Sequence, residues 1–179
     1  MSALTNLGGG LWAGGPALPR PPEQPPEPKV PAAVVYLERP DGRVLALTRG
    51  NDYADWHLPG GKWEPGDGEA GNVLDGGAIA TGPNLRRTAW REVSEETGIR
   101  LDADAGLRPL VSYRTRSGRP VRVFVAEGCT WLPPRFGLYP AGQPAWVPPS
   151  MLTLPTCELA DEAEIILRAV ADDRARRSQ

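Results

Sequence analysis

The chain has 179 residues, of which 40% are hydrophobic, and this is enough apolar material for one hydrophobic core. A formal net charge of −2 leaves no basic field to hold a polymeric nucleic acid. A zinc site is excluded because the chain has only two cysteines and one histidine, and they are not at the spacing of metal ligands. The sequence has neither a secretory leader nor an apolar run of membrane-spanning length, so we expect a cytoplasmic protein with no membrane partner.

The N-terminal segment differs in composition from the rest of the chain. Glycine and proline dominate residues 1–29, and no helical or strand period is sustained there. We therefore predict an extended or disordered N-terminal arm over 1–29, one domain over 30–172, and a short C-terminal tail over 173–179.

Apolar character begins just after this arm. Residues 32–37 read Ala-Ala-Val-Val-Tyr-Leu, a turn signal of proline, aspartate and glycine occupies 40–42, and residues 44–48 read Val-Leu-Ala-Leu-Thr. Two apolar segments around a short turn predict a β-hairpin.

Two glycine-rich segments come next. Residues 58–67 read Leu-Pro-Gly-Gly-Lys-Trp-Glu-Pro-Gly-Asp, which is typical of a tight turn. Residues 68–83 are so rich in glycine that regular structure would be entropically costly, and we predict a loop there.

The following segment has the features of an amphipathic helix. Asn84 is a suitable N-cap and Gly98 a suitable C-terminal stop. Between them Leu85, Ala89 and Val93 recur every four residues, which gives the helix one buried face.

Three carboxylates lie on a different side of this helix. Glu92, Glu95 and Glu96 form one narrow stripe near the C-terminal end. Like charges at this spacing repel one another, and negative charge near a helix C-terminus opposes the macrodipole. A cation should therefore bind there, and carboxylate oxygens are the ligands that Mg²⁺ and Mn²⁺ prefer.

The rest of the chain completes an α/β pattern. Residues 107–115 and 120–127 predict a second strand pair, and residues 158–176 predict a closing helix. Strands flanked by two helices, not in strict alternation, predict a mixed β-sheet between the helices. The apolar residues of the closing helix are Ile165, Ile166, Leu167, Ala169 and Val170.

The glycine turn and the acidic helix together resemble the signature of the Nudix hydrolases. The family pattern is Gly, five residues, Glu, seven residues, then Arg-Glu-aliphatic-x-Glu-Glu-x-Gly-aliphatic. Residues 91–99, Arg-Glu-Val-Ser-Glu-Glu-Thr-Gly-Ile, match its second half at every fixed position. The resemblance implies the Nudix fold, a mixed sheet sandwiched between helices (α/β/α), over residues 30–172, with the Nudix box at 60–99.

The first half of the box departs from the family pattern. Counting from Gly61 reaches Asp67 where the family has Glu, and the two halves are out of register by 16 residues. An insertion over 68–83 is the simplest explanation. The outermost family carboxylate is then supplied by Asp67 or by Glu69, or its position is vacant.

The resemblance also implies roles for individual residues. Glu92, Glu95 and Glu96, with the backbone carbonyl of Gly60, would hold Mg²⁺ or Mn²⁺, and the catalytic set would be these three glutamates with Arg91. The family arginine orients the first glutamate of the motif. Arg91 could instead form a simple helix salt bridge with Glu95.

No loop carboxylate is available as general base, because residues 131–149 contain neither Asp nor Glu. Glu95 within the motif is the preferred candidate. The other acids that we consider are Glu127, Glu158, Asp161 and Glu162.

Three residues near the glycine turn are candidate substrate-binding residues. Arg49 and Lys62 could contact phosphates, and Tyr53 could stack on a base. Packing within the loop, with the charged groups in solvent, is the alternative for these side chains.

The reaction implied by the resemblance is hydrolysis of a phosphoanhydride bond in a nucleoside diphosphate linked to another group. A nucleoside di- or triphosphate is the leading substrate, an ADP-ribose or nucleotide-sugar pyrophosphatase is the first alternative, and a non-catalytic nucleotide-binding module is the second. The expected partner is therefore a small-molecule nucleotide, and a homodimer is left open.

Overall fold

The computed structural model describes residues 29–49, 52–73, 79–99, 106–127 and 142–179, without the side chains of residue 53 and of residues 71–81. All but the last residue of the predicted N-terminal arm lies outside the described residues. Within the described residues, no helix is long and apolar enough to cross a membrane.

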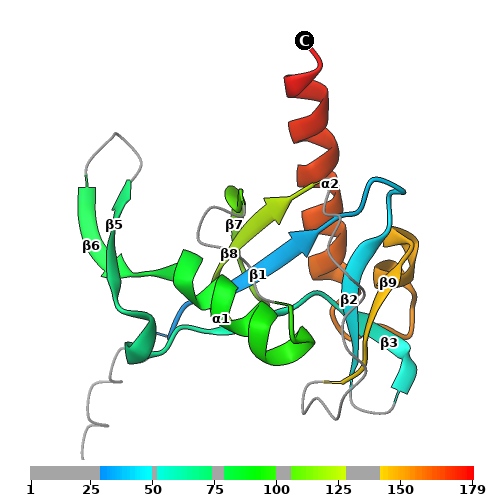
Figure 1. The fold of residues 1–179 in the computed structure, drawn as a ribbon, viewed down its shortest axis with the longest axis horizontal. Helices are drawn as coiled ribbons and strands as arrows, with labels where there is room; N and C mark the ends of the chain where they lie inside the picture. The colour runs from blue at the N-terminus through cyan, green and yellow to red at the C-terminus, as the bar shows by residue number, and fades with distance from the viewer. Residues whose placement is uncertain (1–28, 50–51, 74–78, 100–105, 128–141) are drawn as a thin grey trace, which may run out of the picture.

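Two β-sheets form the centre of the domain (Figure 1). The first, sheet A, has the order β4-β1-β8-β7 and is mixed, because β1 runs parallel to β8 while the other pairs are antiparallel. The second, sheet B, is antiparallel with the order β3-β2-β9. The strands are β1 (Ala32–Leu37), β2 (Val44–Arg49), β3 (Asp52–His57), β4 (Gly60–Lys62), β7 (Arg108–Arg114), β8 (Pro120–Ala126) and β9 (Pro144–Val147).

The predicted hairpin of residues 32–48 is wrong in its pairing. β1 and β2 belong to different sheets, and only the bridge between Glu38 and Val44 joins them beyond the turn. Both strands are almost entirely buried, so each needs covering on both faces. Placing them in two sheets satisfies this requirement, whereas an isolated two-stranded ribbon would expose one face.

Helix α1 (Leu85–Thr97) begins and ends where the sequence predicts. The Asn84 side chain accepts a hydrogen bond from the Arg87 backbone N–H at 3.2 Å, and Gly98 adopts the left-handed conformation with φ 69°. Ala89 and Val93 are fully buried against sheet A. These contacts orient α1 so that the side of the helix that carries the three glutamates does not face the core.

Helix α2 (Ala160–Arg177) closes the domain and runs beyond residue 172, so that most of the predicted tail continues the helix. Acids in its first turn and arginines in its last turn complement the helix dipole. Its buried face is narrower than its apolar content suggests, since Ile165 is 42% exposed. The buried residues are Ala163, Ile166 and Val170.

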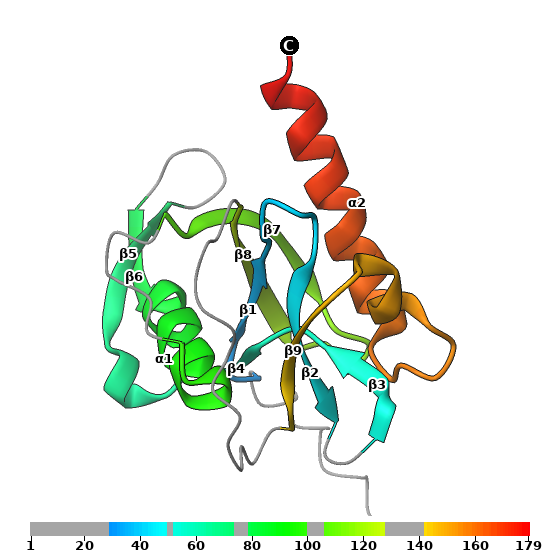
Figure 2. The same ribbon diagram turned by 45° about the vertical axis from the view of Figure 1, so that its right-hand side comes forward.

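The domain is layered, with the sheets between the two helices (Figure 2). Alternate residues of β1 point to opposite faces of sheet A, as the period of a strand requires. Ala33 and Val35 pack in a cluster with α1, whereas Tyr36 packs in a second cluster with sheet B and α2. The mixed-sheet α/β arrangement predicted from the sequence is confirmed.

The predicted loop at 68–83 is instead an antiparallel hairpin, β5 (Glu69–Val73) with β6 (Ile79–Pro83). Its backbone groups pair with each other from Glu69 and Pro83 at the base to Val73 and Ile79, so the glycines do not prevent a ladder. Both views show this hairpin extending to one side of α1, away from the sheets (Figures 1 and 2). It forms a two-stranded sheet of its own.

Candidate active site

The C-terminal part of α1 meets strand β4 at the edge of sheet A. The backbone N–H of Gly60 donates a hydrogen bond to Oε2 of Glu96 at 2.9 Å. β4 is an edge strand, and Gly60 pairs with Val34 of β1. The glycine turn and the acidic helix, separate in sequence, are therefore parts of one site.

Gly61 provides the space that the Glu92 carboxyl group occupies. A Cβ atom at position 61 would lie 2.2 Å from Oε1 of Glu92, far inside van der Waals contact. The double glycine thus brings two carboxyl groups against the backbone of β4, that of Glu96 at Gly60 and that of Glu92 at Gly61.

Arg91 links the glutamates to the turn that precedes them. Its Nη1 lies 2.9 Å from Oε1 of Glu92 and 3.0 Å from Oε2 of Glu95, and its Nη2 donates to the Lys62 carbonyl oxygen at 2.9 Å. The predicted helix salt bridge with Glu95 is present. Arg91 also contacts Glu92, the first glutamate of the motif.

Asp67 is the carboxylate that faces Arg91 from the first half of the box. It is the last residue of the short 3₁₀ helix of residues 65–67, is 2% exposed, and pairs with Arg91 Nε at 3.0 Å. The Thr88 hydroxyl donates to it at 2.9 Å, and the Glu64 backbone N–H at 3.1 Å. Burial alone would raise the pKa of Asp67, but these hydrogen bonds hold it below its usual value. Glu69, the alternative, is exposed.

The surroundings of the Glu92 and Glu96 carboxyl groups disfavour their negatively charged forms. Burial raises the pKa of Glu96 to about 7, the hydrogen bond from Gly60 opposes this shift, and the charges of Glu92 and Glu95 add to it. Burial also raises the pKa of Glu92, and Arg91 counteracts this only in part. A positive charge bound next to Glu92 and Glu96 would therefore stabilise the ionised forms of both groups.

The residues present fit a divalent cation in their chemistry. All the side-chain donors are carboxylate oxygens, which suit Mg²⁺ and Mn²⁺. In the described part of the chain, no three acidic, histidine or cysteine side chains already stand close enough to hold a metal ion. Glu92 and Glu95 are turned toward Arg91, and binding of an ion would need their oxygens to turn inward.

The three predicted substrate-binding residues have different surroundings. Arg49 is ion-paired with Asp55 at 2.9 Å and Glu158 at 3.2 Å, so its guanidinium joins β3 to the segment just before α2. The Lys62 side chain is exposed next to Gly61 at the site. The side chain of Tyr53 lies outside the described residues.

Three of the four general-base candidates outside the motif, Glu127, Glu158 and Glu162, have partners elsewhere. Glu162 accepts a hydrogen bond from the Tyr113 hydroxyl at 2.8 Å. Glu127 is paired with arginines of β7 and α2, and Glu158 with Arg49. Asp161 lines a surface hollow formed by α2 and Val111 of β7. Glu95 has a side chain that is 59% exposed and lies within the motif itself.

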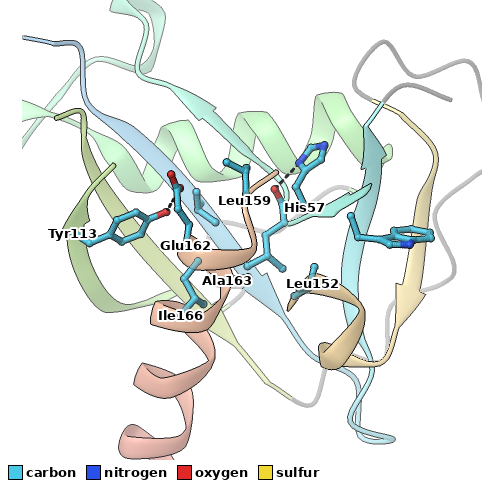
Figure 3. A pocket seen from close by; sticks show the side chains of 10 residues that line it. His57, Tyr113, Leu152, Leu159, Glu162, Ala163 and Ile166 are labelled. Carbon is cyan, nitrogen blue, oxygen red and sulfur yellow. Dashed lines mark hydrogen bonds between the residues drawn. The ribbon is translucent and has the colours of Figure 1, made fainter. Parts of the chain in front are cut away.

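A pocket lies on the face of sheet A opposite α1, and sequence reasoning missed it (Figure 3). Val34, the sheet partner of Gly60, and Leu58, two residues before it, both line the pocket. Its cavity volume is about 30 Å³, and about 310 Å³ when the open space at its mouth is included. Its walls come from β1, β3, β7, the 3₁₀ helix of residues 149–153 and α2, whose sequence positions carry no common signal. The lining residues are Val34, Trp56, His57, Leu58, Tyr113, Leu152, Leu159, Glu162, Ala163 and Ile166.

Comparisons with known proteins agree with this arrangement. A family model described as the NUDIX domain matches residues 28–168. No curated protein sequence matches the chain.

Three solved structures illustrate the similarity in fold. A nudix hydrolase family member from Chromobacterium violaceum has a TM-score of 0.53 and 23% identity, with 84% of this chain and 82% of that chain covered. An Ap4A hydrolase from C. elegans has a TM-score of 0.52 and 15% identity, with 83% of this chain and 99% of that chain covered. A MutT protein from Methanosarcina mazei Go1 has a TM-score of 0.50 and 21% identity, with 82% of this chain and 96% of that chain covered.

Proposed function

Because this chain belongs to the NUDIX domain family, it is a pyrophosphohydrolase, and we propose that it hydrolyses nucleoside di- or triphosphates with Mg²⁺ or Mn²⁺ as cofactor. The observation that carries the proposal is the packing of Glu92 and Glu96 against Gly61 and Gly60, with Arg91 beside them. Carboxyl groups with raised pKa values, held against a glycine turn, suit a cation that binds a diphosphate.

Glu92, Glu95 and Glu96 would hold the ion, with the Gly60 carbonyl as a further ligand by analogy with the family. Such an ion supplies charge neutralisation of the diphosphate and makes a water molecule more acidic. Arg91 positions Glu92 and Glu95, and the exposed Lys62 side chain, which follows Gly61, is the proposed phosphate contact.

Glu95 is the proposed general base. It is the most exposed of the three motif glutamates, so water can reach its free oxygen. In the reaction a water oxygen forms a bond to one phosphorus, the phosphoanhydride P–O bond breaks, and Glu95 takes the proton of the water. The leaving phosphate group retains the electron pair of the broken bond.

A panel assay tests the proposal. Purified protein would be incubated with nucleoside triphosphates, nucleoside diphosphates, ADP-ribose, UDP-sugars and dinucleoside polyphosphates, with Mg²⁺ or with chelator, and products identified by chromatography. We expect the nucleoside di- or triphosphates to be hydrolysed fastest, and only with metal. Preferential hydrolysis of ADP-ribose or a UDP-sugar would contradict the substrate proposed here.

The control for this assay is Glu164→Gln. Glu164 is exposed on α2 and is not among the residues that line the pocket, so its substitution should leave every rate unchanged.

A further inference from the structure

The surface hollow between α2 and β7 contains an exposed apolar side chain. The hollow has a cavity volume of about 420 Å³, and Val111 of β7 forms one wall while residues of α2 form the rest. Ile165 lines it and is 42% exposed, and among the described residues only Val30 is another large hydrophobic side chain with such exposure. A single exposed isoleucine is common, but one that shares a concave surface with Val111 and Ala169 indicates a docking surface.

The hollow lies at an open side of sheet A. Strand β7 is the outermost strand of this sheet, so one of its edges has no strand partner among the described residues. Pro109 in this strand lacks a backbone N–H, which disfavours the addition of a further strand. A partner at this side would therefore pack through side chains, on β7 and α2 together.

Strand β7 and helix α2 run antiparallel along this surface. Tyr113 donates a hydrogen bond to Glu162 at 2.8 Å at one end (Figure 3), and Arg108 Nη2 lies 2.6 Å from Asp173 Oδ2 toward the other. The strand from 108 to 113 and the helix from 162 to 173 each span about 16 Å, so the two elements stay in step. The turn that follows β7 therefore lies beyond the N-terminal end of α2.

Charged side chains of both signs follow this surface. Asp161, Arg168 and Asp172 line the hollow, and with Ile165 they form one stripe of α2. Arg116 is exposed in the turn after β7. Within the residues that the structure describes, none of these four charged groups has an ion-pair partner. The stripe thus offers opposite charges that are free to pair with another molecule.

We propose that this surface binds a second copy of the chain in a two-fold symmetric dimer. Such an interface uses the same patch on both copies, so the patch must be complementary to itself. A two-fold axis at Ile165 brings the two Ile165 side chains together and makes the two α2 helices antiparallel. The helical rise then places Asp161 of one copy within about 1.5 Å of the level of Arg168 of the other.

The remaining charges also find partners in this arrangement. Asp172 of the second copy reaches a level about 10 Å from the axis, past Asp161 of the first copy. The turn that carries Arg116 lies there, beyond the N-terminal end of α2. Each half of the interface therefore pairs two acids with two arginines. A partner of a single charge sign would leave either the acids or the arginines unmatched, so the pattern favours a second copy.

Sedimentation equilibrium of the full chain from about 1 μM to about 200 μM tests the proposal. We expect the average mass of the wild type to rise toward twice that of one chain. Ile165→Asp should raise the dissociation constant at least about tenfold, because it places two like charges at the axis. Arg168→Asp should have a similar effect. The control is Arg87→Glu, which changes an exposed arginine of α1 and should leave the dissociation constant unchanged.

A variant that exchanges the charges is the sharper test. Asp161→Arg and Arg168→Asp in the same chain restore opposite charges across the proposed axis. Each substitution alone should weaken the dimer, whereas the double variant should return to within about threefold of the wild-type dissociation constant. Melting temperatures measured in parallel would show that each variant is folded.

Three outcomes would overturn the inference. Wild-type protein that stays monomeric over the whole range would do so directly. A dimer that Ile165→Asp leaves intact would show that the copies associate through another surface. A double variant as weak as the single ones would show that Asp161 and Arg168 do not meet. Hydrolysis plays no part in these measurements, so their result is independent of the function proposed above.

Discussion

The backbone N–H of Gly60 donates a hydrogen bond to the Glu96 carboxyl group at 2.9 Å, although 36 residues separate the two along the chain. This contact, with that of Glu92 against Gly61, sets the distance between helix α1 and strand β4. The two glycines meet different kinds of neighbours, and their substitutions should therefore have different consequences.

Gly61→Ala should lower activity with little effect on stability. The added Cβ would lie 2.2 Å from the end of the Glu92 side chain, which can rotate away at small cost to the fold. That rotation displaces a proposed metal ligand, and we expect kcat/KM to fall by roughly 10²-fold, as for misplacement of a catalytic group. Steady-state kinetics and thermal unfolding would measure the two effects. Full activity in this variant would show that the position of Glu92 is unimportant.

Gly60→Ala is the contrasting variant. There the Cβ would lie 2.4 Å from the Ala33 carbonyl oxygen and 2.9 Å from Val34 Cα, and the backbone cannot rotate away. We expect a loss of about 1–3 kcal/mol in the free energy of unfolding, measured by urea denaturation. A change in stability equal to that of Gly61→Ala would contradict the close packing of β1 against β4.

Asp67→Asn should destabilise the protein. Asp67 is 2% exposed and holds Arg91 through an ion pair of 3.0 Å, so the substitution leaves the arginine without its buried counter-charge. We expect a loss of about 3 kcal/mol in the free energy of unfolding. Asp41→Asn is the matched control, because its pair with Arg39 is exposed and long, at 3.9 Å, and should contribute less than about 1 kcal/mol. Equal losses in the two variants would mean that Asp67 is not a structural anchor.

The acidic helix could be predicted closely because its information is local. Asn84 and Gly98 cap α1, and the motif between them fixes which side of the helix carries Glu92, Glu95 and Glu96. A short spacing on one helix determines relative positions directly. For this part of the molecule, the sequence and the structure agree.

Features that depend on distant segments could not be predicted in this way. β1 and β2 follow one another in sequence like a hairpin, yet β1 pairs with β8 in one sheet and β2 with β9 in the other. The pairing of Tyr113 with Glu162 joins β7 to α2 across 49 residues. Neither residue type nor spacing identifies such partners, because they meet only when the sheets have formed.

Stability should depend on pH through Glu127, which joins β8 to the C-terminal part of α2. Arg174 Nε lies 2.7 Å and Arg108 Nη2 3.2 Å from its oxygens, and Arg177 also contacts it. Burial would raise the pKa of Glu127, but the hydrogen bonds from the arginines lower it below the usual 4.5. The stabilisation is therefore complete above about pH 4.5 and lost as the pH falls through the lowered value.

The measurement is the difference in melting temperature between wild type and Glu127→Gln from pH 7 to pH 3. The wild type should be more stable near neutral pH, and the difference should shrink in the acid range. Glu164→Gln, which removes an exposed acid with no ion pair among the described residues, should show no such trend. A difference that grows toward low pH would contradict the sign of the pKa shift.

Removal of the β5–β6 hairpin should leave the domain folded and active. The hairpin closes at its base, where the Asn84 backbone N–H donates to the Gly68 carbonyl at 3.0 Å, so a two-residue linker can replace 69–83. We expect melting temperature and hydrolysis rates close to those of the full chain. An altered substrate preference in the folded deletion variant would instead make the hairpin part of the substrate site.

The central claim is that hydrolysis depends on a divalent cation held by Glu92, Glu95 and Glu96. Its most direct test is the rate of nucleoside triphosphate hydrolysis as a function of free Mg²⁺, for wild type and for Glu96→Gln. The wild type should be inactive in chelator and recover on adding excess Mg²⁺. Glu96→Gln should keep the wild-type melting temperature in chelator, yet turn over at least about 10²-fold more slowly. Equal wild-type rates with chelator and with Mg²⁺ would contradict the claim.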